Sequence, residues 1–245
     1  MAANVKNVIV GAAQIFTSTG TGASRPRTTV DASGLNWSTQ SAAGYLTSSG
    51  QAANWRELGY TTSGLEVSYE PGYGEVMVDQ LLDAARLFKQ TVKVMLKTEL
   101  SEGTLENIHL VFGQADKVNT YSGTTGSEVT VFNAGTSAEA AAKNASLNIS
   151  GGALGEAPVE RSIVAIGQAP GNIGTAASAV DVSSVKKKER VYIARRVVQV
   201  EVSSHGLKRD TATVFPVQFR CLPDDNDLYD GAEYGVIIDR VYSTL

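Results

Sequence analysis

Residues Gly64 to Gln114 read GLEVSYEPGYGEVMVDQLLDAARLFKQTVKVMLKTELSEGTLENIHLVFGQ, and this stretch decides the fold. Three short runs within it, 65–70, 76–79 and 92–97, alternate apolar with polar residues. Such alternation, rich in β-branched and aromatic residues, is typical of half-buried β-strands. Pro71-Gly72 stands between the first two runs and predicts a turn. We therefore expect three strands, with a turn after the first and a bend after the second.

The polar sides of these three runs are charged. A strand that turns its apolar side towards a core must turn the other side towards water. The first two runs carry carboxylates, and the third carries lysines that are placed to pair with carboxylates across the ladder. The residues are Glu66, Glu70, Glu75, Asp79, Lys93 and Lys97.

After Ser101 the spacing of the apolar residues becomes helical. Leu105, Ile108 and Phe112 recur at intervals of three and four, which places them on one face of a helix. The Ser101 hydroxyl is expected to cap the helix, and Gly113 is expected to end it. We expect the helix to pack on the sheet through Leu105, Ile108 and Phe112.

The composition indicates a sizeable β-rich domain. The chain has 245 residues, enough to bury a substantial core, and its 24 glycines suit many short strands joined by turns. The net charge of −4 argues against a surface built to hold nucleic acid. Cys221 is the only cysteine, which excludes an intrachain disulfide. No run is long and apolar enough to span a bilayer or serve as a signal peptide, so folding in a cytoplasm is expected.

The remainder of the chain continues the β pattern. We expect a single domain over residues 1–245, with long loops rich in Ser, Thr, Gly and Ala at 17–54 and 115–158. Short strands are expected within the second loop, over 128–132 and 146–150. Pro216 predicts an edge position or a bulge, because proline cannot donate to a ladder. Further strands are predicted at Val8–Phe16, Arg161–Gln168, Arg190–Val202, Thr213–Leu222 and Tyr234–Tyr242.

Residues that could carry catalysis are few. His109 and His205 are the only histidines, and neither belongs to a metal-binding motif. The acidic turn at 224–227 departs from the spacing of a calcium loop. Cys221 lies on a predicted strand and is most simply a small core residue. We expect no enzymatic activity, cofactor or metal site.

Several segments together resemble a known family. LGYTTSGLEVSYEPGYGEVMVDQ is followed by a lysine-bearing strand and by the helix start ELSEGTLENI. ERSIVAIGQAPG, VYIARRVVQVEVSSHGLKRDTATVFPVQFRCLPDDND and YGVIIDRV follow in order in the second half. This arrangement resembles the major tail tube protein of long-tailed bacteriophages, over roughly residues 1–16 and 55–245. The helix start carries the resemblance through Leu100, Glu102, Thr104, Leu105, Glu106 and Asn107.

The resemblance implies a fold and a role. The expected fold is mainly β, a β-sandwich or partial barrel with one packed helix, whose inner sheets join into a continuous barrel in a hexameric ring. Stacked rings would form the tail tube, a hollow conduit that double-stranded DNA crosses without specific binding. The expected partners are further copies of the chain, the tape measure protein, the tail terminator and the baseplate or initiator proteins, with no membrane partner. Assembly would occur in the cytoplasm of the host bacterium, and the mature location would be the virion.

The same resemblance implies roles for the charged residues. Glu75 and Asp79 are assigned to the lumen, together with Lys93 and Lys97 on the neighbouring strand. Glu66 and Glu70 are assigned either to the lumen or to a subunit interface. All of these side chains could instead simply keep the surface soluble.

Two other functions remain open on the sequence alone. The chain could form the inner tube of a contractile tail or a related injection device. A carbohydrate-binding or adhesin β-sandwich is a more remote alternative, and it would favour clustered exposed aromatic residues. The nine tyrosines are scattered singly along the sequence.

Overall fold

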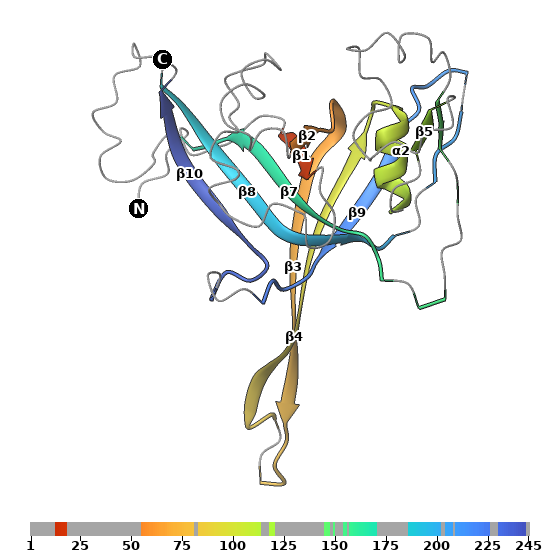
Figure 1. Cartoon of the computed structure of the whole chain (residues 1–245). Coiled ribbons are helices and arrows are strands. Elements are labelled where there is room, and N and C mark those ends of the chain that lie inside the picture. The colour runs from red at the N-terminus through yellow and green to blue at the C-terminus, as the bar shows by residue number, and fades with distance from the viewer. Residues whose placement is uncertain are drawn as a thin grey trace.

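Over the residues that it describes, the computed structural model shows an antiparallel sheet of eight strands with one helix, and these strands do not close into a barrel (Figure 1). The strand order is β2-β1-β7-β8-β9-β4-β3, and β10 also pairs with β8. The fold-class prediction is thus confirmed as a mainly β chain with one helix. The structure describes residues 13–18, 55–80, 83–113, 118–120, 145–147, 149, 154–155, 157–170, 186–201, 204–207, 209–225 and 230–243.

The strands of the main sheet differ widely in length. The longest form a hairpin of β3, Thr61–Val76, and β4, Arg86–Leu100. Its outer part extends well beyond the other strands (Figure 1). The remaining strands are β1 Gln14–Ser18, β2 Trp55–Glu57, β7 Glu160–Gln168, β8 Lys186–Gln199, β9 Phe215–Cys221 and β10 Gly235–Ser243.

The turn predicted at Pro71-Gly72 is wrong. β3 runs through both residues as one strand, with Pro71 opposite Val92 and Gly72 opposite Thr91. Proline is tolerated here because β3 lies at the end of the strand order and has to pair only with β4. The ladder shifts register directly after Gly72, since Tyr73 lies opposite Lys89 and leaves one extra residue in β4.

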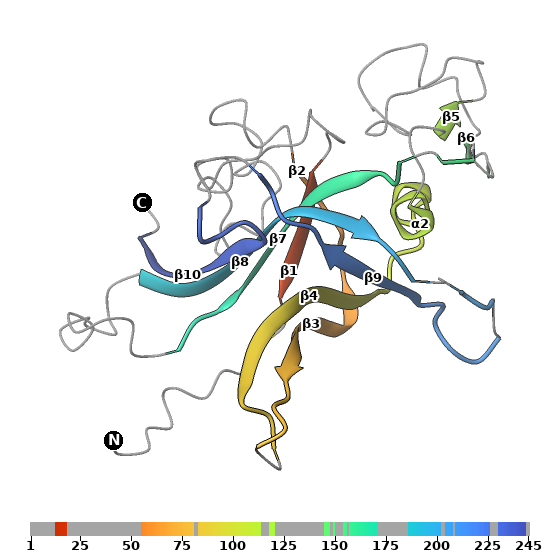
Figure 2. The same ribbon diagram turned by 90° about the horizontal axis from the view of Figure 1, so that it is seen from below.

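The sheet curves back on itself, so that β4 and β9 pack over β7 and β8 (Figure 2). This curvature begins at β8, which pairs with β10 along most of its length and with β9 only at its end. The main core lies between the two layers and includes Leu96, Leu100, Ile163, Ala165, Val197, Val217 and Phe219. A second apolar cluster, Phe16, Trp55, Val164, Ile166, Val191 and Ile193, lies on the other face of β7 and β8.

The helix α2, Leu105–Phe112, begins at a different cap from the one predicted, and the predicted packing residues are not its most buried ones. Thr104, and not Ser101, is the N-cap, and its side chain accepts from the backbone N–H of Asn107. Gly113 ends the helix in the left-handed conformation as predicted, with φ 63°. Ile108 and Phe112 pack against the core but are only partly buried, and Leu105 is half-buried. The fully buried apolar residues are Leu110 and Val111.

A buried polar contact fixes the start of α2 to the segment before β3. The Asn107 side-chain amide donates to the carbonyls of Leu58, at 3.0 Å, and Glu102, at 2.9 Å. Its oxygen accepts from Arg56 Nη1 at 2.7 Å. Burial lowers the pKa of Arg56, while the Glu106 carboxylate raises it. The two segments that carry most of the resemblance, around Gly59 and Glu102, therefore meet in space.

The other strand predictions are largely confirmed. The strands predicted at 161–168, 190–202, 213–222 and 234–242 correspond to β7, β8, β9 and β10. Pro216 lies beyond the part of β9 that pairs with β8, which agrees with the predicted edge position.

The ranges predicted as loops include residues of three strands. Thr17 and Ser18 belong to β1, so the first loop cannot begin at 17. The second contains a two-stranded sheet of β5, Val118–Thr120, and β6, Ala145–Leu147. The predicted strand at 128–132, the N-terminal part of the strand at 8–16 and most of both loops lie outside the described residues.

Candidate functional site

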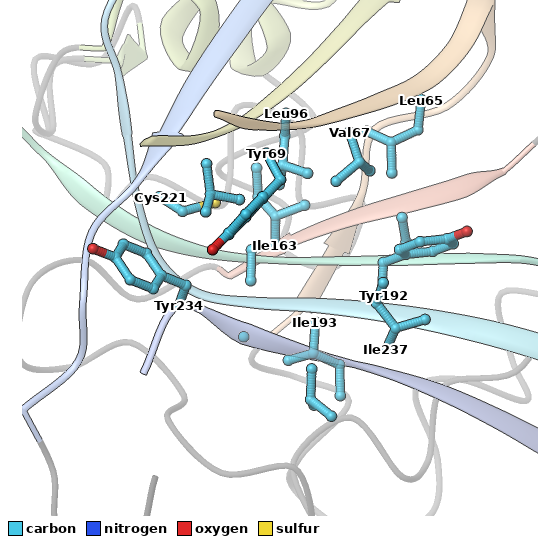
Figure 3. A pocket seen from close by; sticks show the side chains of 15 residues that line it. Leu65, Val67, Tyr69, Leu96, Ile163, Tyr192, Ile193, Cys221, Tyr234 and Ile237 are labelled. Carbon is cyan, nitrogen blue, oxygen red and sulfur yellow. The ribbon is translucent and has the colours of Figure 1, made fainter. Parts of the chain in front are cut away.

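The outer part of the β3–β4 hairpin, residues 69–93, is the most exposed element of the described chain, and we call it the arm. Side chains alternate between its two faces, because successive residues of a strand point to opposite sides. Leu65, Val67 and Tyr69 begin the face that points towards β8 and β10 (Figure 3). Tyr73 and Glu75 continue that face, since the extra residue lies in β4 and leaves the alternation of β3 intact.

The opposite face of the hairpin carries paired charges. Glu66 lies opposite Lys97, and Glu70 lies opposite Lys93. Lys93 Nζ is 3.8 Å from Glu70 Oε2, and all four side chains are exposed. Cross-strand pairing of this kind was predicted for the two lysines. We call these four residues the paired-charge face.

The six charged residues singled out from the sequence therefore do not share one surface. Glu75 lies on the opposite face of the hairpin from Lys93 and Lys97. Asp79 lies in the turn at the end of the arm, outside both strands, and is exposed. The expected lumen group of Glu75, Asp79, Lys93 and Lys97 is thus divided between two faces and a turn. This division follows from β3 being one continuous strand and not two strands joined by a turn.

The arm exposes an unusual number of large apolar side chains. Isolated exposed apolar residues are normal on a protein surface, whereas several close together mark an interaction site. The periodicity of the sequence did not indicate this exposure, because alternation predicts a buried apolar side. The exposed residues are Tyr69, Tyr73, Val76, Met77, Val78, Leu87 and Phe88.

Lys89 lies on the face of the arm that carries Tyr69 and Tyr73. Its ammonium donates to the hydroxyl of Tyr69 and lies 5.1 Å from the centre of the Tyr69 ring. The hydrogen bond to Tyr69 raises the pKa of Lys89. Sequence reasoning missed this group because 20 positions separate its members. The arrangement places a cation against an aromatic ring on an exposed surface.

An apolar groove lies between the base of the arm and strands β8 and β10 (Figure 3). Its volume is about 300 Å³. One wall comes from β3, β4 and β9, and the other from β7, β8 and β10. The lining residues are Leu65, Val67, Tyr69, Val94, Leu96, Ile163, Ala165, Tyr192, Ile193, Ala194, Cys221, Tyr234, Gly235, Val236 and Ile237.

The groove contains one thiol, that of Cys221. Burial raises the pKa of the Cys221 thiol to about 12, so it stays protonated and weakly nucleophilic near neutral pH. Within the described residues, no three His, Cys, Asp or Glu side chains are grouped so as to hold a metal ion. His109 is buried in α2. His205 packs between Phe112 and Phe215 with tilted rings, whose centres lie 6.3 Å and 4.7 Å from that of His205. The groove is arranged to receive apolar groups.

Within the described residues, two long strands, β3 and β10, have a partner on one side only, and the short β2 is the third strand that ends the sheet. Among the described residues, β3 pairs only with β4 and β10 pairs only with β8. Both strands are long, with 16 residues in β3 and 9 in β10. Unpaired N–H and C=O groups along such an edge form a template for another strand.

No protein-family model matches the chain, and no curated protein matches it significantly. In the part of the chain that the structure describes, no helix has the length and apolar character needed to cross a membrane.

Proposed function

We propose that this protein is the subunit of a bacteriophage tail tube, which assembles into stacked hexameric rings around a channel for DNA. The observation that carries the proposal is the pair of free edges, on β3 and β10, beside an arm that exposes apolar side chains. In a monomer this apolar surface stays in contact with water, which is unfavourable, whereas a subunit of an assembly buries it. The resemblance of the sequence to tail tube proteins supports the same role, and nothing in the described residues favours an enzyme.

The free edges suggest how subunits join. Natural β proteins protect exposed edges, because an unprotected edge promotes uncontrolled association. When each subunit adds its sheet to that of the next, the edges disappear into a closed ring. The joined sheets would then form the continuous barrel around the channel. Further copies of the chain are the main partners, with the tape measure, terminator and baseplate or initiator proteins at the ends of the tube.

The paired-charge face suits the wall of a DNA channel. Glu66, Glu70, Lys93 and Lys97 give that face two negative and two positive charges, and the exposed Arg220, opposite Met95, adds one positive charge. A wall whose charges nearly cancel neither holds phosphate nor repels it strongly, whereas a strongly basic wall would retain DNA electrostatically. We therefore assign this face to the lumen. Glu75 and Asp79, which the resemblance alone assigned to the lumen, are assigned to contacts between subunits.

Negative-stain electron microscopy of the purified protein over a range of concentrations tests the proposal. We expect rings or hollow tubes, with sedimentation velocity showing species much larger than a monomer. A compact monomer at every concentration, also with a tail initiator complex present, contradicts the proposal. The inner tube of a contractile tail would use the same surfaces, and a sheath around the particles would distinguish it.

One observation favours a second candidate function. The tyrosines are scattered along the sequence, but Tyr69 and Tyr73 are both exposed and lie on one face of the arm. Lys89 lies beside Tyr69. Exposed aromatic rings along one face are a feature of carbohydrate-binding surfaces. Binding of the monomer to bacterial surface glycans, abolished by Tyr69→Ala, would support an adhesin. Without glycan binding this candidate is excluded.

A further inference from the structure

The chain carries two apolar surfaces that are open in the isolated molecule. The first is the arm, where Leu87 is 60% exposed and lies among other exposed apolar side chains. The second is the groove, where Ile237 is likewise 60% exposed on the β10 wall. Each surface alone would mark a contact with some other molecule. Because both lie on one chain, a contact between two copies would cover both surfaces at once.

Tyr69, at the base of the arm, lines the groove of its own molecule, but the outer end of the arm cannot reach that groove (Figure 1). The groove lies beside the base of the hairpin, formed by residues such as Leu65 and Val67. The outer end of the arm extends away from that base and from the rest of the sheet (Figure 1). The apolar residues at the outer end of the arm can therefore reach a groove only on a second copy.

We infer that the arm of one copy lies in the groove of the next copy. This inference rests on the proposed function and names the contact through which the subunits join. The groove, at about 300 Å³, is at the small end of the range for binding pockets, which suits a few inserted side chains. Leu87, Tyr73 and Met77 are exposed apolar side chains of the arm that could fill it.

A contact of this type has a direct consequence for assembly. Because arm and groove are different surfaces, the interface is heterologous, and each copy still has a free arm at one end and a free groove at the other. Such contacts continue from copy to copy until a ring closes or a filament forms. The free edges of β3 and β10 border the same groove, so this contact would also bring a second copy next to these edges.

Three single variants test the inference. Leu87→Asp places a charge on the arm, and Ile237→Asp places one on the wall of the groove. Leu207→Asp is the matched control, because Leu207 is 89% exposed and belongs to neither surface. All three side chains lie largely in solvent, so the monomers should fold, and circular dichroism checks this.

Sedimentation velocity and electron microscopy then measure assembly. We expect Leu87→Asp and Ile237→Asp each to raise the concentration required for assembly at least tenfold, with Leu207→Asp behaving as the parent protein. An equal mixture of the two defective proteins should form a one-to-one heterodimer. The Leu87→Asp protein offers an intact groove, and the Ile237→Asp protein offers an intact arm, so one productive contact remains.

Other results overturn the inference. If both variants assemble like the parent protein, the arm does not occupy the groove, although the proposed tube remains. If only Ile237→Asp blocks assembly, another segment fills the groove. If the mixture stays monomeric, the two surfaces do not form one interface. A parent protein that never assembles removes the proposed function together with this inference.

A chemical cross-link provides a second measurement that avoids introduced charge. A Leu87→Cys protein is mixed with an Ile237→Cys protein under assembly conditions and treated with a short bifunctional maleimide. We expect a cross-linked dimer, while Leu207→Cys mixed with Ile237→Cys should remain uncross-linked. Equal cross-linking in both mixtures, or none in either, contradicts the arm-in-groove contact.

Discussion

At the scale of single residues, the described structure depends on a few polar contacts that join distant segments. Asn107 is buried and bridges Arg56, Leu58 and Glu102, and so connects the start of α2 with the segment leading into β3. Between β8 and the edge strand β10, Arg190 holds the Asp239 carboxylate through two hydrogen bonds, at 2.6 and 2.8 Å. These contacts lie at very different depths, so their substitution should have very different effects.

Replacing Asn107 with alanine should destabilise the fold strongly. Three hydrogen bonds are lost, and the carbonyl of Leu58 and the guanidinium of Arg56 remain in poorly solvated positions. We expect the free energy of unfolding to fall by roughly 2–4 kcal/mol in chemical denaturation. Glu106→Gln is the control, since it keeps the carbonyl that Arg56 contacts and should cost less than about 1 kcal/mol. Equal effects of the two substitutions would mean that the Asn107 contacts contribute little.

The Arg190–Asp239 pair predicts a specific pH dependence. The hydrogen bond from Arg190 holds the pKa of Asp239 below its usual 3.8. A carboxyl whose pKa is lowered by folding stabilises the folded state above its unfolded pKa, and this contribution is lost as the pH falls through the folded pKa. The parent protein should therefore be more stable than Asp239→Asn by a constant amount from pH 5 to 8. The difference should shrink below about pH 4.

The size of this effect should be small. The pair is partly exposed, and exposed ion pairs contribute less than about 1 kcal/mol. Urea denaturation at several pH values measures the difference between the two proteins. A difference that grows as the pH falls would show that the pair does not stabilise the fold.

At the scale of elements, α2 shows that a helix prediction can name residues that pack against the core and still miss the most buried ones. The helical spacing of Leu105, Ile108 and Phe112 is present, but these residues flank the contact with the sheet. Leu110 and Val111 occupy its centre. Phe112 instead lies at the border of the core, where its ring centre is 6.3 Å from that of His205.

Alanine substitutions should reveal this ranking. Leu110 is 1% exposed, so Leu110→Ala should cost about 2–5 kcal/mol through lost burial and the cavity it leaves. Phe112→Ala should cost less than the roughly 3–5 kcal/mol of a fully buried phenylalanine, because its ring is only partly buried. Chemical denaturation of both variants measures the difference. A larger loss for Phe112→Ala would mean that the helix docks through the predicted face after all.

At the scale of the whole molecule, each subunit of the proposed tube has two kinds of surface with different roles. The paired-charge face is assigned to the channel, and the arm and groove to the contact between copies. Because Glu70 and Glu75 lie on opposite faces of one strand, substitutions at these two positions separate the roles.

Reversing the charges of the paired-charge face should slow the passage of DNA. Glu66→Lys combined with Glu70→Lys turns the nearly balanced face into one with four lysines and Arg220 in each subunit, which should bind phosphate. Assembled tubes are expected to form, but DNA ejection from reconstituted particles should be slower, and most so at low salt. Glu75→Lys is the matched control and should leave ejection unchanged. The reverse result would assign the opposite face of the hairpin to the channel.

The sequence by itself determined the type and order of most elements that the structure describes. Alternation along 65–70 and 92–97 specified strands, and the change of spacing after Ser101 specified a helix ending at Gly113. Such local patterns are readable because a strand or helix with one buried side imposes its own period on the chain. The cross-strand pairing of Lys93 with a carboxylate was also within reach of this reasoning.

Only the tertiary structure decided which surfaces these elements expose. Pro71 stays within a strand because β3 is an edge, and that position depends on the order of strands in the sheet. The continuity of β3 then placed Glu75 and Lys93 on opposite faces. The groove joins β3 with β10, although Leu65 and Ile237 lie far apart in the sequence. The periodicity of the sequence indicates which side chains are apolar and so favour burial. Whether the same molecule or another one buries them depends on how distant strands are arranged.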